Sequence, residues 1–186
     1  MAKLYFKYGV VNSSKSANAL MTIHNYEEQG MRVFVIKSVV DTRDGGFVKS
    51  RALADTREAD IVVTYSDDLY KILSGITADV IIIDECQFLE ARQIDDLRKI
   101  ANDTGIPVIC YGLKTDFLTH LFPSSKRLLE LADSIQEIKT VCRCGRKAIF
   151  NARIDETGKV VKTGDVIKVG GNELYRPVCS ECYYRS

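Results

Sequence analysis

The chain lacks a charge excess, a long apolar run and a leader pattern, and each absence disfavours a class of protein. Its 26 Lys and Arg residues almost cancel its 25 Asp and Glu residues, which leaves a net charge of +1. A general nucleic-acid binder carries a basic patch or stripe, so this class is disfavoured. No apolar run approaches the roughly 20 residues that span a bilayer, and the N-terminus has no signal-peptide pattern. We therefore expect a cytoplasmic protein that binds neither a membrane nor nucleic acid.

Histidine is also scarce, and neither histidine is expected to be catalytic. The two histidines, His24 and His120, have no Ser or Cys partner at a spacing typical of nucleophilic catalysis.

Internal repeats and low-complexity segments are absent from the sequence. A hydrophobic content of 46% over 186 residues is enough for one ordinary domain with its own core and a small appendage.

The first distinctive stretch predicts a strand, a small-residue turn and a helix. The turn, Gly9 to Ser16, resembles G-x-x-x-x-G-K-[ST], in which backbone N–H groups and a lysine hold phosphate while a hydroxyl binds Mg²⁺. Ser14 stands where the second glycine of this motif belongs. On this stretch alone, a polar turn in which Ser13 or Ser14 caps the helix and Lys15 is solvated explains the sequence as well. The predicted phosphate-binding residues are Gly9, Asn12, Ser13, Ser14, Lys15 and Ser16.

Apolar runs that alternate with helical patterns predict an α/β fold, with a parallel P-loop sheet and helices on both faces. Ligands of such sheets bind at the carboxyl ends of the strands. We expect residues 41–60 to form a long surface loop and residues 112–123 a flap over the site. The expected strands are 3–7, 32–37, 61–63, 79–83 and 107–111, and the expected later helices are 67–73, 90–102 and 124–133.

From Ile138 onward two cysteine pairs flank an expected hairpin of residues 148–154 and 159–162. Cys142 and Cys144 form one pair, and Cys179 and Cys182 form the other. Four thiolates in two close pairs suit a closed structural Zn²⁺ site, whereas unliganded buried thiols are the alternative. We predict a division into residues 1–137 and a small zinc-binding β module of residues 138–186.

Two carboxylates follow the most apolar run of the sequence, Ile81 to Ile83. Asp84 is expected to bind Mg²⁺ together with Ser16, because it ends a central strand across the sheet from the phosphate loop. Glu85 projects differently and is a candidate general base toward an acceptor hydroxyl. The alternative is that both carboxylates cap the following helix. Cys86 and Cys110 belong to core strands and are expected to pack as apolar side chains.

With these residues in view, the chain resembles the zinc-containing thymidine kinases of the bacterial and animal cytosolic type. The resemblance runs nearly end to end. It is carried by residues 4–6, 12–16, 25–28, 84–89, 111–113, 115–117, 139–140, 142, 144–148, 170–173 and 175.

This resemblance implies transfer of the ATP γ-phosphoryl group to the 5′-hydroxyl of thymidine or deoxyuridine, with Mg²⁺ on ATP and a structural Zn²⁺. Residues 1–137 would then be the P-loop nucleotide-binding kinase domain, and residues 138–186 the zinc module with a nucleoside-binding loop. Glu85 is implied to be the base for the 5′-hydroxyl. Members of the family are usually homotetramers. They are feedback-inhibited by thymidine triphosphate. The implied nucleoside-binding residues are Val11, Phe117, Phe122, Val166, Val169, Gly170 and Tyr175.

Three residues depart from the family pattern. Ser14 replaces a glycine, Val11 stands where methionine is common, and Leu118 replaces a frequent arginine. They motivate a second hypothesis, a catalytically weakened homologue that binds thymidine nucleotides as a sensor or subunit. A third hypothesis, a zinc-ribbon nucleic-acid binder with a P-loop motor, is disfavoured by the near-zero net charge.

Overall fold

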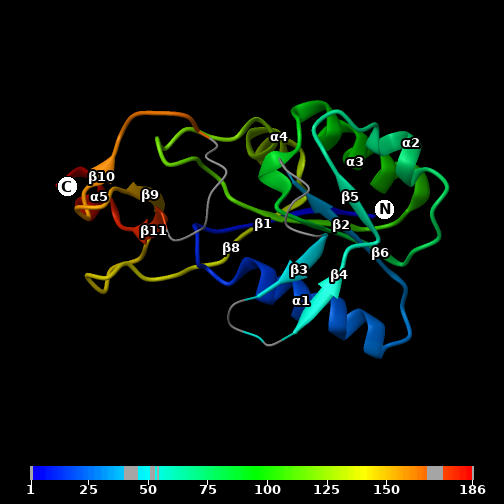
Figure 1. Cartoon of the computed structure of the whole chain (residues 1–186). Coiled ribbons are helices and arrows are strands. Elements are labelled where there is room, and N and C mark those ends of the chain that lie inside the picture. The colour runs from blue at the N-terminus through cyan, green and yellow to red at the C-terminus, as the bar shows by residue number, and fades with distance from the viewer. Residues whose placement is uncertain (1, 40–45, 51–52, 54, 167–173, 186) are drawn as a thin grey trace.

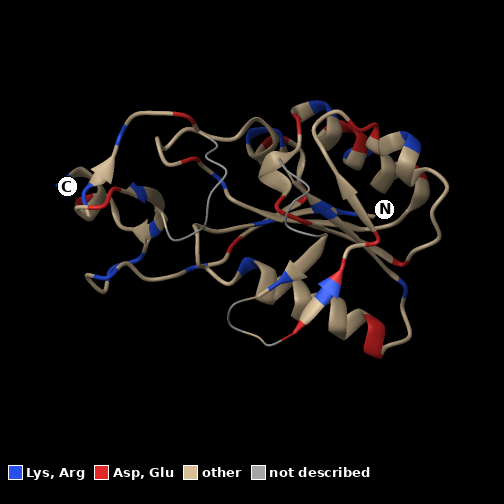
Figure 2. Cartoon of the chain, viewed as in Figure 1, with Lys and Arg blue, Asp and Glu red and all other residues tan. Residues whose placement is uncertain are grey.

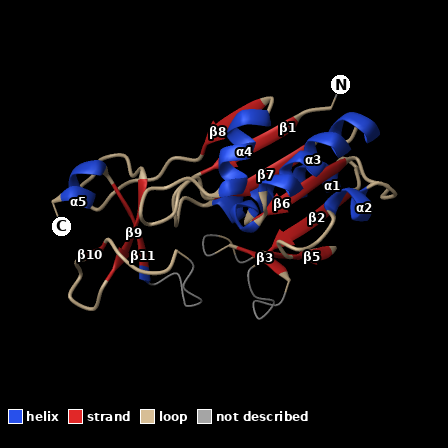
Figure 3. Cartoon of the chain, turned by 90° about the horizontal axis from the view of Figure 1, so that it is seen from above, coloured by secondary structure: helices blue, strands red, loops and turns tan. Residues whose placement is uncertain are grey.

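The structure is a computed structural model that describes residues 2–39, 46–50, 53, 55–166 and 174–185. Its main feature is a six-stranded, fully parallel sheet with strand order β5-β2-β6-β7-β1-β8 (Figures 1 and 3). The predicted α/β class with a parallel sheet is confirmed. The strands in that order are β5 (Ile61–Val63), β2 (Val33–Ser38), β6 (Val80–Asp84), β7 (Val108–Gly112), β1 (Leu4–Tyr8) and β8 (Ser134–Glu137).

Helices cover both faces of this sheet (Figure 1). On one face lies α1 (Lys15–Glu28), whose Ala19, Leu20 and Ile23 are buried against the strands. On the other lie α2 (Leu69–Leu73), α3 (Ala91–Thr104) and α4 (Pro123–Leu131). Side chains of β6 that point to the two faces enter two separate core clusters, so the apolar run of this strand is buried on both sides.

A second, smaller sheet lies beyond the carboxyl ends of the large sheet (Figure 3). It consists of β9 (Phe150–Ile154), β10 (Val160–Val161) and β11 (Tyr175–Val178) in the order β10-β9-β11. The predicted hairpin is present as β9 and β10. The third strand, β11, and the short helix α5 (Ser180–Tyr184) were not predicted. Figure 2 shows basic and acidic residues on both parts of the molecule.

The structure corrects two predictions about residues 1–137. Residues 41–60 are not simply a loop, because β3 (Phe47–Lys49) and β4 (Thr56–Glu58) pair in an antiparallel ribbon beside α1. Val48 of this ribbon is fully buried in the same cluster as the apolar face of α1, which explains why the segment is ordered there. The helix predicted to reach Asp133 ends at Leu131, and the edge strand β8 begins at Ser134. None of the helices in the described part of the chain combines the length and apolar character that crossing a membrane requires.

Candidate functional site

The loop between β1 and α1 has a constrained backbone. Asn12 and Ser14 both have left-handed conformations, with φ of 57° and 63°. Gly9 donates its N–H to the carbonyl of Gly112 at 3.2 Å. A Cβ atom at Gly9 would lie only 2.2 Å from Ser13 Oγ and 2.7 Å from the carbonyl oxygen of Ile138, so this position requires glycine.

Lys15 is folded over this loop rather than extended into solvent. Its Nζ donates to the carbonyl of Val10 at 2.8 Å. Burial lowers the pKa of the Lys15 ammonium, and the nearby carboxylates of Glu85 and Asp84 act against that shift. Ser14 occupies the N-cap position of α1 without a side-chain capping hydrogen bond. These contacts do not support the alternative of a plain capping turn with a solvated lysine.

The loop also holds a polar atom suited to an anion. Ser13 is buried, and its Oγ has no hydrogen-bond partner within the described part of the chain. A buried hydroxyl without a partner costs free energy unless a ligand satisfies it. Together with Lys15 at the start of α1, this hydroxyl makes the loop chemically suited to phosphate.

Asp84 ends β6 beside this loop, as the sequence predicts. It is buried, and Ser16 Oγ donates to its Oδ2 at 3.3 Å. Burial, together with the neighbouring charge of Glu85, raises the pKa of the Asp84 carboxyl to about 7 against the opposing charges of Lys15 and Lys37. A hydroxyl and a carboxylate held together are suitable ligands for Mg²⁺, whose charge would favour the ionised carboxylate.

Glu85 leaves the line of the strand because its backbone is left-handed, with φ of 57°. It precedes the 3₁₀ helix η2 (Cys86–Phe88), and its side chain makes no capping hydrogen bond there. Instead, Glu85 Oε2 accepts from Gln87 Nε2 at 2.5 Å, while Gln87 Oε1 accepts from the N–H of Leu113 at 3.0 Å. Gln87 therefore orients the carboxylate against the start of the flap, a contact that the sequence analysis missed. The alternative role of Glu85 as a helix cap is not supported.

The flap between β7 and α4 is stabilised by hydrogen bonds within the flap and by a contact with α5. Asp116 Oδ1 accepts from the N–H groups of Leu118 at 2.8 Å and His120 at 2.9 Å. Phe117 and Phe122 are both buried. The carbonyl of Phe117 accepts from the hydroxyl of Tyr183 at 2.8 Å, which fastens the flap to α5.

Two residues of β9 join the flap to the other loops. Asn151 Oδ1 accepts from the N–H of Val11 at 2.7 Å, and its Nδ2 donates to the carbonyl of Thr115 at 2.6 Å. The Arg153 guanidinium lies 3.7 Å from the ring centroid of Phe117. These contacts were not predicted, because no local sequence pattern indicates them.

Arg153 also contacts both ends of the segment 165–175, which contains the implied nucleoside-binding residues Val166 and Tyr175. It donates to the carbonyl of Asp165 and, at 3.3 Å, to the hydroxyl of Tyr175. Val166 is exposed. Val169 and Gly170 lie outside the described residues. The structure thus connects Tyr175 to the flap through Arg153.

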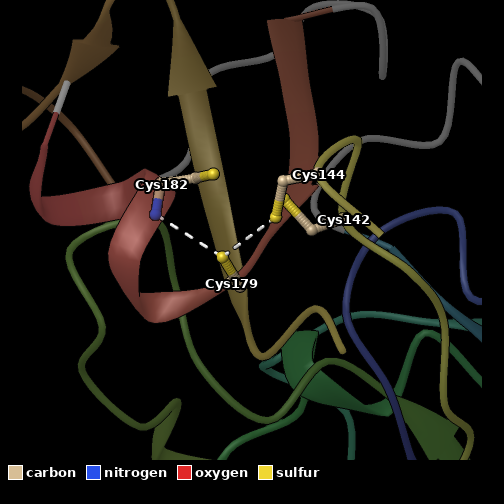
Figure 4. A group of neighbouring side chains, drawn as sticks. All are labelled: Cys142, Cys144, Cys179 and Cys182. Carbon is tan, nitrogen blue, oxygen red and sulfur yellow. Dashed lines mark hydrogen bonds between the residues drawn. The ribbon is translucent and has the colours of Figure 1, made fainter. Parts of the chain in front are cut away.

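The four cysteines predicted to bind metal gather in one place (Figure 4). Their sulfur atoms all lie within 4.8 Å of one another, and Cys144 Sγ is 3.5 Å from Cys179 Sγ. Four sulfurs around Zn²⁺ at about 2.3 Å would be about 3.8 Å apart in a tetrahedron, so the observed cluster suits such an ion. The N–H of Cys182 and the neighbouring thiols lower the pKa of the Cys179 thiol and so favour its thiolate, whereas the same thiols raise the pKa of Cys182. Cys86 and Cys110, by contrast, are buried in the main core as predicted.

We expect the Asp84→Asn substitution to stabilise the protein when neither Mg²⁺ nor nucleotide is added. Between pH 3.8 and about 7 the folded chain binds a proton at Asp84 that the unfolded chain releases, so stability falls as the pH rises through this window. At pH 8 the variant should gain about 1 to 2 kcal/mol in the free energy of unfolding. This is less than the free energy that the full pKa shift of Asp84 corresponds to, because burial of the asparagine amide also costs free energy. Urea unfolding at pH 4 and pH 8 measures this, with Asp96→Asn on α3 as control. A variant less stable than the parent at pH 8 would contradict the expectation.

A family model and sequence relatives match nearly the whole chain. A protein-family model described as "Thymidine kinase" matches residues 2–183, which include the phosphate loop, the end of β6 and all four clustered cysteines. The thymidine kinase of Streptococcus agalactiae serotype Ia is 44% identical over 187 residues, covering 99% of this chain and 98% of that protein. The thymidine kinase of Streptococcus pyogenes serotype M3 matches with the same identity and coverage. The crystal structure of Pif1 helicase from Candida albicans is similar with a TM-score of 0.42 at 15% identity, over 76% of this chain and 37% of that one.

Proposed function

The chain belongs to the thymidine kinase family, and on this premise we propose which of its residues transfer the ATP γ-phosphoryl group to the 5′-hydroxyl of thymidine or deoxyuridine. The observation that carries the assignment is the convergence of two loops at the carboxyl ends of β1 and β6. There Ser16 Oγ meets Asp84 Oδ2 at 3.3 Å, and Lys15 lies close enough to Asp84 and Glu85 for their charges to affect its pKa. A loop for phosphate, a ligand pair for Mg²⁺ and a carboxylate thus occupy one end of the sheet.

In the proposed reaction, the 5′-oxygen of the nucleoside forms a bond to the γ-phosphorus of ATP. The bond from that phosphorus to the β,γ-bridging oxygen breaks, and ADP leaves. Glu85 accepts the proton of the 5′-hydroxyl, and Gln87 keeps its carboxylate oriented. Gly9, Asn12, Ser13, Ser14 and Lys15 hold the phosphates.

Mg²⁺ bound with ATP would offset the charge of the phosphate oxygens. We assign Ser16 and Asp84 to hold it. The buried position of Asp84 and the contact from Ser16 support this assignment.

We assign the nucleoside to residues of four segments. Val11 comes from the phosphate loop, Phe117 and Phe122 from the flap, and Tyr175 from β11. The contacts of Asn151 and Arg153 support this grouping, because they tie these segments together. Val166, Val169 and Gly170 complete the proposed set.

Cys142, Cys144, Cys179 and Cys182 are proposed to hold one structural Zn²⁺. Four protein ligands leave no open coordination position, so this ion stabilises the small sheet and α5 and takes no part in the chemistry. The contact between Tyr183 and the carbonyl of Phe117 supports an indirect effect on the flap.

We also propose a homotetramer located in the cytoplasm. Met21 on α1 and Ile135 on the edge strand β8 are large apolar side chains with exposed fractions of 56% and 46%, which suits contacts between copies. A reaction of ATP with a free nucleoside suits the cytoplasm.

A coupled kinase assay with purified protein tests the proposed function. ADP formation should require thymidine or deoxyuridine as well as ATP and Mg²⁺, and deoxycytidine and deoxyguanosine should support little turnover. Isothermal titration with thymidine in the same buffer separates turnover from binding. Binding of thymidine without ADP formation would instead identify the chain as a nucleotide sensor or subunit.

We expect the Ser14→Gly substitution to improve the use of ATP. Ser14 holds a left-handed conformation that glycine adopts without strain, and its exposed side chain gives α1 no capping bond. Relief of about 1 kcal/mol would lower the KM for ATP or raise kcat by about fivefold at most. Both constants are measured at saturating thymidine and fixed Mg²⁺.

Asn12→Gly is the matched control for Ser14→Gly. Asn12 has nearly the same backbone conformation, with φ of 57°, but asparagine tolerates it better than serine, so the gain should be smaller. A clear loss of activity in Ser14→Gly would show that the Ser14 hydroxyl contacts phosphate and would overturn the strain interpretation.

A further inference from the structure

Asn151 connects the phosphate loop to the flap from a third part of the chain. It is only 2% exposed, and both ends of its side-chain amide are used. Its Oδ1 accepts from the N–H of Val11 at 2.7 Å, and its Nδ2 donates to the carbonyl of Thr115 at 2.6 Å. We propose that Asn151 is a positioning residue that sets the separation of the phosphate loop and the flap, and so aligns the acceptor hydroxyl with ATP. This inference rests on the proposed function of the site.

The two backbone groups require a side chain with an acceptor and a donor. The N–H of Val11 needs an acceptor and the carbonyl of Thr115 needs a donor, so the orientation of the amide is fixed by its partners. Aspartate has the same shape but would place an oxygen against the carbonyl oxygen of Thr115. Leucine would leave both backbone groups without a partner. Asparagine is therefore the short side chain that satisfies both.

Asn151 acts on the two loops at positions close to the reacting groups. Val11 lies between Val10, whose carbonyl holds Lys15, and the left-handed Asn12. Thr115 is two residues before Phe117, the buried aromatic of the flap. A shift of Asn151 would thus displace the phosphate-binding lysine relative to the nucleoside.

The strand that carries Asn151 is also held by contacts within the small sheet. The neighbouring Ala152 is fully buried with Ile154 and Tyr183 in the core of the small sheet. Residues 150–153 of β9 pair with β11 in antiparallel register. Asn151 consequently extends from a rigid element toward two loops, which is the geometry that positioning requires.

The test compares Asn151→Asp and Asn151→Ser with the parent, all as full chains loaded with zinc. Aspartate keeps the shape of the Asn151 side chain but lacks its N–H donor, and serine offers only one short hydroxyl. In both variants kcat per active site should fall about 10- to 100-fold, because a displacement of about 1 Å between reactants can cost a hundredfold in rate. The Kd values for thymidine and for ATP should change by less than about threefold, since neither ligand is assigned a contact with Asn151.

Active sites are counted from the stoichiometry of thymidine binding, and zinc content and thermal unfolding are recorded for each protein. A merely structural role would reduce the number of active sites and leave kcat per site unchanged. Tyr183→Phe is the matched control, because it removes a second hydrogen bond from the small-sheet side to the flap without touching the phosphate loop. It should raise the KM for thymidine more than it lowers kcat.

Three results would overturn this inference without affecting the proposed function. They are a kcat per site within twofold of the parent in either folded variant, a loss of rate matched by an equal loss of binding, or a failure of both variants to fold with zinc. The last result would assign Asn151 to stability. A parent protein that binds thymidine but does not phosphorylate it would instead overturn the proposed function itself.

Discussion

The Glu85→Gln variant should turn over thymidine about a hundredfold or more slowly than the parent, while thymidine binding is retained. The substitution keeps the size and the hydrogen-bonding shape of the side chain but removes its ability to accept the proton of the 5′-hydroxyl. Glutamine can still accept from Gln87 Nε2, the contact that orients Glu85. The loss should therefore appear in kcat and leave the Kd for thymidine nearly unchanged.

Glu90→Gln provides the matched control for this experiment. Glu90 caps α3 through a reciprocal pair of hydrogen bonds with Gln93, and a glutamine there can still accept from the backbone. Its turnover should equal that of the parent. If Glu85→Gln also turns over like the parent, Glu85 is not the base, and the proton must leave by another route.

Removal of zinc should abolish both thymidine binding and turnover. Metal analysis should find about one equivalent of zinc per chain, and a strong chelator should release it. The helix α5 has only five residues and carries Cys182, so it is too short to persist without the ion. Loss of α5 would free Tyr183, whose hydroxyl holds the carbonyl of Phe117 in the flap.

The Cys179→Ser and Cys110→Ala variants separate this effect from a general loss of thiols. Cys179→Ser should lose zinc and activity together, since Cys179 is central to the cluster and its Sγ lies 3.5 Å from that of Cys144. Cys110→Ala should retain zinc, because Cys110 lies in the main core. Re-addition of zinc should restore the chelated parent. Fully active metal-free protein would contradict the assignment.

The parts of the fold that the sequence predicts are those with a strong local pattern. The run Ile81 to Ile83 is fully buried, as expected for a central strand, and Asp84 and Glu85 follow it directly. The paired cysteines meet although 35 residues separate Cys144 from Cys179, because metal-ligand spacing is itself a local signal. The predicted division at residues 137 and 138 coincides with the end of β8 and stays a prediction.

The parts that the sequence did not predict depend on contacts between distant segments. β8 has mostly exposed side chains, so neither alternation nor an apolar run marks it, and it forms by pairing with β1. The ribbon of β3 and β4 is ordered by burial of Val48 beside α1. Gln87 and Asn151 form hydrogen bonds with backbone groups of loops far away in the sequence. Such contacts produce no periodic pattern in the sequence, so they could not be predicted from it. For this reason the sequence predicts candidate reacting residues but not the side chains that contact their loops.

The central claim is that this one site joins ATP and thymidine and transfers phosphate between them. The most direct measurement quantifies ADP and thymidine 5′-monophosphate in the same reaction of purified protein with ATP, Mg²⁺ and thymidine. The account predicts that both products form in equal amounts, that neither forms without thymidine, and that the phosphate is on the 5′-oxygen. Formation of ADP without phosphorylated thymidine, or no product at all from protein that binds thymidine, would contradict it.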